Sequence, residues 1–184
     1  MLIVLLLSAG QGGCTREDAA PQGVTMQLTP SKTAYRLNEN IVIAVKLTNP
    51  GSKPCQIIPD LETIVQIVDM SRDGMPIEPS YTVRTHFIES ERFVHDKLIQ
   101  LEPHSSREFS WQSVPWTSTG AGVAFLASPL GTENPRVIAR WSIDESGDYK
   151  LTARNLLPTF MRLLPDACAA PTDSLTITFT VIQK

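Results

Sequence analysis

Short stretches in which apolar and polar residues alternate run from residue 24 to residue 184, and this pattern constrains the fold most strongly. Alternation with a period of two places every second side chain on one face, as in a strand with one buried side. Fourteen prolines and ten glycines punctuate the chain, which argues against a helical bundle and for many turns. We expect strands at 24–28, 41–48, 63–70, 81–84, 98–101, 107–111, 137–143, 149–154 and 175–181.

These stretches follow one another without helices between them, which predicts an all-β antiparallel sandwich of about 7–9 strands. The stretches 137–143 and 149–154 are expected to pair as a hairpin across residues 144–148. A chain of 184 residues can form one ordinary domain, which we place at 24–184. Its 16 Lys and Arg residues against 19 Asp and Glu residues give no strong positive field, so nucleic acid is not an expected partner.

Residues 2–9 form an apolar run at the start of the chain. A membrane-spanning helix needs about 20 apolar residues, so this run is too short to be one. Its length suits the apolar region of a secretion signal, and small residues follow it as a signal peptidase requires. Export with cleavage after Ser8-Ala9-Gly10 is one interpretation, and a cytosolic chain is another.

A second cleavage pattern lies just beyond this run. Gly12 and Gly13 stand directly before Cys14 and resemble a bacterial lipobox. The resemblance implies a signal peptide at 1–13, a lipid on Cys14 and a polar tether over 14–23 that joins the membrane to the domain. In a Gram-negative cell it also implies the periplasmic face of the outer membrane, because Thr rather than Asp follows the cysteine.

The chain has three cysteines, Cys14, Cys55 and Cys168, an awkward number for an exported protein. If a lipid occupies Cys14, the other two are left to form a disulfide in an oxidising compartment. Such a bridge would hold the segment around Cys168 near the turn that precedes Cys55. The alternative is two free thiols packed as small hydrophobic residues.

Three local motifs resemble those of immunoglobulin-like sandwiches. Residues 144–151 read Asp-x-x-Gly-x-Tyr-x-Leu and resemble the tyrosine corner, with Tyr149 as its tyrosine. Residues 35–41 and 101–106 resemble turns of bacterial macroglobulin-like domains and of the intracellular proteinase-inhibitor type. Asn38 and His104 replace the usual glycines, and both residue types tolerate the positive φ that such turns need. The resemblance implies the fold and says little about function.

Motifs of known catalytic sites are missing from the sequence, including the nucleophile elbow, the zinc-protease helix and the phosphate-binding loop. His86 and His95 bracket several carboxylates, but their spacing suits a charged surface loop better than a metal site. We therefore expect a protein that is not an enzyme, with no catalytic residue, no bound metal and no cofactor.

Two insertions, 112–135 and 155–172, carry apolar residues without the alternation of strands. The second has helical spacing, which predicts one or two short helical turns. Both insertions either fold back onto their own domain or present an apolar patch to a partner. The candidate partner-binding residues are Trp116, Phe125, Phe160 and Met161.

The expected function is a lipid-anchored cell-envelope binding or assembly protein, attached to the membrane through its lipid and docking an unidentified envelope protein. One alternative is a proteinase inhibitor, suggested by the resemblance at residues 35–41. Another is an accessory protein that handles carbohydrate or metal, with Trp111, Trp116 and Trp141 as sugar platforms.

Overall fold

The computed structural model describes residues 23–83, 97–115, 122–130, 137–156, 164, 166–169 and 173–183. Cys14, the signal peptide and nearly all of the tether lie outside these residues, and so do Trp116, Phe160 and Met161. Within the described chain, no helix has the length and apolarity to cross a membrane.

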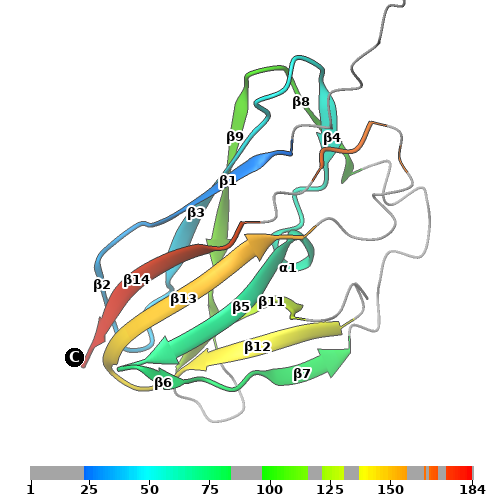
Figure 1. Ribbon diagram of the computed structural model, residues 1–184. Coiled ribbons are helices and arrows are strands. Elements are labelled where there is room, and N and C mark those ends of the chain that lie inside the picture. Colours follow the sequence, from blue (N-terminus) through cyan, green and yellow to red (C-terminus); the bar gives the residue numbers. More distant parts are fainter. Residues whose placement is uncertain are drawn as a thin grey trace, which may run out of the picture.

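The first sheet has three antiparallel strands in the order β1-β3-β9 (Figure 1). These strands are β1 (Thr25–Pro30), β3 (Val42–Thr48) and β9 (Ser106–Gln112). In β3 the expected alternation is present, because Ile43, Val45 and Leu47 are fully buried while Lys46 is exposed. Burying three such side chains stabilises the domain by about 5–9 kcal/mol before entropic costs are counted.

The second sheet has nine strands. Its main path is β2 (Ala34–Arg36), β14 (Leu175–Ile182), β13 (Gly147–Asn155), β5 (Val65–Arg72), β11 (Val123–Pro129), β12 (Val137–Ile143) and β7 (Ser80–Val83). Two short strands join from the side, β6 (Met75–Pro76) on β5 and β10 (Val114–Pro115) on β11. The pairs β2–β14 and β5–β11 are parallel, and the other pairs in this sheet are antiparallel.

A small third sheet pairs β4 (Cys55–Ile57) with β8 (Ile99–Leu101). One helical turn, α1 (Leu61–Ile64), leads from β4 into β5. The strand expected from residue 63 therefore begins at Val65. The helical turn α1 lies outside both insertions, 112–135 and 155–172, in which helical turns were predicted.

The two large sheets pack face to face around one apolar core. Trp111 of β9 lies against Phe125 of β11 with ring centroids 4.6 Å apart. On the other side of the core, Phe179 contacts Tyr35 edge-on and stacks on Tyr149. The predicted all-β, immunoglobulin-like sandwich is confirmed.

The expected hairpin across 144–148 is wrong. The strand β13 pairs with β14 and β5, whereas β12 pairs with β11 and β7. The link between β12 and β13 thus passes β11 and β5 within the same sheet rather than returning along a neighbouring strand.

The insertion 112–135 also differs from its prediction, because β11 occupies its middle. Six of the seven residues of β11 are buried and the other is half-buried. A strand covered on both faces shows no polar alternation, which is why the sequence pattern did not identify it.

Candidate functional site

The link between β12 and β13 lies at one end of the sandwich (Figure 1). Tyr149 of β13 is buried beside this link. The Tyr149 hydroxyl donates a hydrogen bond of 2.8 Å to the Glu145 carbonyl oxygen, as in a tyrosine corner. Burial raises the pKa of this hydroxyl above its ordinary value. We call this end the corner end and define it by residues 37–40, 72–75, 144–147 and Ile182.

Backbone contacts hold the turn at 72–74 against this link. The Asp73 amide donates to the Asp148 carbonyl oxygen, and the Asp148 amide donates to Asp73 Oδ1, each over 2.8 Å. A Cβ at Gly147 would lie 2.6 Å from Asp73 Oδ2 and 2.8 Å from Arg72 Cγ, so a side chain there would displace both neighbours. Arg72 and Glu145 form an ion pair of 2.6 Å at the surface. These contacts hold the turn at 72–74 and the link between β12 and β13 against each other.

The motif at residues 35–41 also lies at the corner end. The buried Tyr35 hydroxyl donates to the Val42 carbonyl oxygen over 3.0 Å. Glu39 accepts a hydrogen bond of 2.8 Å from the Arg36 amide, and this bond, helped by Lys32, lowers the pKa of its carboxyl. Each of these groups shapes the turn, so the resemblance to proteinase-inhibitor domains is accounted for by fold alone.

Asn38 and His104 adopt φ values of 69° and 55°, which confirms their prediction as replacements for glycine. Asn38 has a further contact that its sequence position did not reveal, because its Oδ1 accepts a hydrogen bond from the Gly122 amide. Gly122 has φ +102°, and a Cβ there would lie 2.8 Å from the Ile143 carbonyl oxygen.

The opposite end of the sandwich carries a disulfide between Cys55 and Cys168, which confirms the predicted pair. Backbone bonds join the same two segments, because the Gln56 amide donates to the Asp166 carbonyl oxygen and the Cys168 amide donates to that of Gln56. The segment 166–169 thereby lies alongside β4, as expected from the predicted bridge. We call this the disulfide end and define it by Val24, residues 49–55, 102–106 and 166–169.

The first strand enters the sandwich at the disulfide end. The Val24 amide donates a hydrogen bond of 2.8 Å to the Ala169 carbonyl oxygen. Nearby, the buried side chain of Asn49 donates to the carbonyl oxygens of Lys53 and Leu101 and accepts from the Gly51 amide. The sequence predicted only a turn after Asn49, and it did not reveal that the buried side-chain amide of Asn49 holds this turn together.

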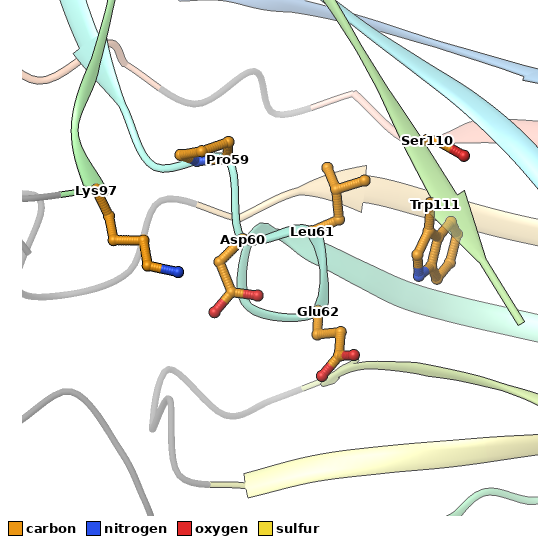
Figure 2. A pocket seen from close by; sticks show the side chains of 7 residues that line it. All are labelled: Pro59, Asp60, Leu61, Glu62, Lys97, Ser110 and Trp111. Carbon is orange, nitrogen blue, oxygen red and sulfur yellow. The ribbon is translucent and has the colours of Figure 1, made fainter. Parts of the chain in front are cut away.

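A cleft of about 420 Å³ lies between α1 and β9 (Figure 2). Its lining residues are Pro59, Asp60, Leu61, Glu62, Lys97, Ser110 and Trp111. Two carboxylates, Asp60 and Glu62, and one ammonium group, Lys97, contribute to it, so its net formal charge is about −1. Among the described residues, no three His, Cys, Asp or Glu side chains converge as a metal site would require.

Of the four predicted partner-binding residues, the structure describes Phe125. Its side chain is fully buried in β11 against Trp111, so the prediction that Phe125 lies in an exposed patch is wrong. Trp111 and Trp141 are also buried, 2% and 4% exposed, and neither ring offers a face to a sugar. Trp116, Phe160 and Met161 lie outside the described residues.

The described neighbours of the two predicted docking segments lie at opposite ends of the sandwich. Pro115 pairs with Val123 beside Gly122 at the corner end. The Leu156 amide instead donates to the Ile64 carbonyl oxygen at the start of β5, near the disulfide end. The chain therefore enters these two segments from different ends of the domain.

No family model matches the sequence, and no curated protein matches it either. Among solved structures, the chain is similar to part of the native α2-macroglobulin of Escherichia coli, in a structure that spans domain MG7 to the C-terminus. The identity is 12% and the TM-score is 0.34, and the alignment covers 87% of this chain and 16% of that chain. The assignment of the fold rests on the sheets described above.

Proposed function

We propose that this protein is a lipid-anchored extracytoplasmic binding module that holds a partner in the cell envelope and does no catalysis. The observation that carries this proposal is the disulfide between Cys55 and Cys168. Disulfides persist in oxidising compartments and are rare in the cytosol of ordinary cells, so the bridge supports export.

The same bridge leaves Cys14 as the remaining cysteine. A single leftover thiol in an exported protein calls for a separate explanation. Lipid attachment after Gly12 and Gly13 provides one, and the diacylglycerol together with an amide-linked chain would give stable anchoring. The polar residues 15–23 then serve as the tether.

Replacing Cys14 with Ser tests the anchor. The lipidated protein is expected in the membrane fraction of its host, and the Cys14→Ser variant is expected in the soluble fraction after the same lysis. A Cys14→Ser variant that stays in the membrane fraction would contradict the anchor.

We assign partner binding to the segment that contains Trp116, between Pro115 and Gly122, and Phe125 no longer belongs to the candidate residues because it is buried. The described neighbours of this segment lie at the corner end, whose turns are held by hydrogen bonds, and a surface that needs little reordering loses little entropy on binding. Trp is also the residue type that most often dominates the binding energy of an interface. The segment containing Phe160 and Met161 remains a second candidate.

Chemical cross-linking in intact cells tests this assignment with Trp116→Ser, Phe160→Ser and a matched surface control, Gln27→Ser, on the exposed face of β1. We expect one adduct of constant mass that disappears in Trp116→Ser and persists in the control. Its persistence in Trp116→Ser would contradict the assignment. A fall in melting temperature of about 10 °C would instead place Trp116 in the core, because losing a buried aromatic side chain costs about 3–5 kcal/mol.

A further inference from the structure

We propose, building on the lipid anchor above, that the domain stands on its membrane with the disulfide end towards the lipid and the corner end directed away. This orientation follows from where the chain enters the sandwich and from how far the tether can reach.

The entry point is fixed by hydrogen bonds. Val24 is bonded to Ala169, one residue from Cys168, so the start of the first strand belongs to the disulfide end. The other terminus lies at the corner end, because the Leu37 amide donates to the Ile182 carbonyl oxygen over 2.8 Å. Figure 1 shows the C-terminus at the lower left, with β4 and β8 at the opposite, upper side.

The two ends are separated by the length of β13, which runs from Gly147 at the corner end to Asn155, paired with Val65, at the other. Nine residues of strand span about 30 Å. Ten residues of chain from Cys14 to Val24 can span at most about 35 Å. An inverted domain would need nearly this whole length to reach the lipid, whereas the proposed orientation needs only a small part of it.

Most of the described large exposed apolar side chains lie at the corner end, away from the proposed lipid surface. Among the residues described with their side chains, the large exposed hydrophobic ones are Met75, Val114, Leu130 and Ile182. Met75 lies in the turn at the corner end, and Val114 pairs with Ala124 near Gly122. Ile182 is bonded to Leu37. Three of these four residues therefore lie at the corner end, which the proposed orientation directs away from the lipid.

The orientation is tested by energy transfer from a dye on the lipidated protein to acceptor-labelled phosphatidylethanolamine in vesicles. Ser174→Cys places the dye at the disulfide end, because Leu175 next to it pairs with Ala153. Met75→Cys places it at the corner end, where Met75 is 59% exposed. Both thiols are labelled without reductant, which leaves the native disulfide intact.

We expect several-fold stronger transfer from position 174 than from position 75. Inserting ten Gly and Ser residues after Gln22 should narrow the difference, because the longer tether lets the domain tumble. Equal transfer from both positions on a protein whose lipid is verified by mass would overturn the orientation and leave the anchor standing. A chain extracted from host membranes without lipid on Cys14 would overturn both proposals.

Discussion

Removing the disulfide should destabilise the domain by about 4–5 kcal/mol. The bond joins residues separated by 113 positions, and closing a loop of that size in the unfolded chain removes entropy worth about 4.7 kcal/mol. A further fraction of a kcal/mol is expected because Cys168 is 4% exposed and its replacement by Ala leaves a small void. The double variant Cys55→Ala/Cys168→Ala avoids mispaired thiols, and Cys14→Ser serves as the common background.

Urea unfolding at 25 °C measures this loss through the fluorescence of Trp111 and Trp141, which are both buried in the core. The oxidised parent is the reference, and the chemically reduced parent is the matched control because it keeps both side chains. We expect the double variant and the reduced parent to unfold at similarly lower urea concentrations. A loss below about 1 kcal/mol would refute the entropic argument and show that the bridge only ties residues 166–169 to β4.

Three further changes test the corner end and the turn at Asn49. Tyr149→Phe should cost about 1 kcal/mol at pH 7 through the lost bond to Glu145. Burial raises the pKa of Tyr149, so its contribution is complete below about pH 10 and is lost as the pH rises through the raised value. The stability of the variant should therefore depend less on pH above about pH 10, and a profile identical to that of the parent would contradict the burial argument. Gly122→Ala should cost about 1–3 kcal/mol in urea unfolding, since φ is +102° and Ile143 blocks the new methyl group; a neutral change would mean that the turn relaxes freely. Asn49→Ala should cost about 2 kcal/mol and accelerate amide exchange at Gly51, and protection equal to the parent would exclude the side-chain bond.

Local patterns predicted the elements that they physically determine. β3, β13 and β14 each bury one face, so their alternation is visible in the sequence. Asn38 and His104 were identified because few residue types tolerate positive φ. The disulfide followed from counting, since the lipobox resemblance had assigned one of the three cysteines, Cys14, to a lipid.

What the sequence missed depends on contacts between distant residues. The pairing of β12 was wrong because a tyrosine corner and a hairpin both begin with a turn, and only Tyr149 bonding to Glu145 distinguishes them. The bond from Gly122 to Asn38 spans 84 positions and leaves no local signature. Phe125 was assigned to an exposed loop because its strand lacks alternation.

The candidate site was only partly accessible to sequence analysis for the same reason. Which residues belong to the corner end or to the disulfide end is set by strand order, which period-two alternation does not encode. The cleft beside α1 brings Asp60 and Glu62 next to Ser110 from a strand about 50 positions away. Neither grouping follows from a motif.

Intact mass measured without reductant, on protein taken from the membrane fraction of its native host, tests the central claim most directly. The account predicts a chain that begins at Cys14, carries the mass of the lipid and lacks the two thiol hydrogens of Cys55 and Cys168. A fully reduced chain without lipid, still beginning at Met1, would contradict both export and anchoring.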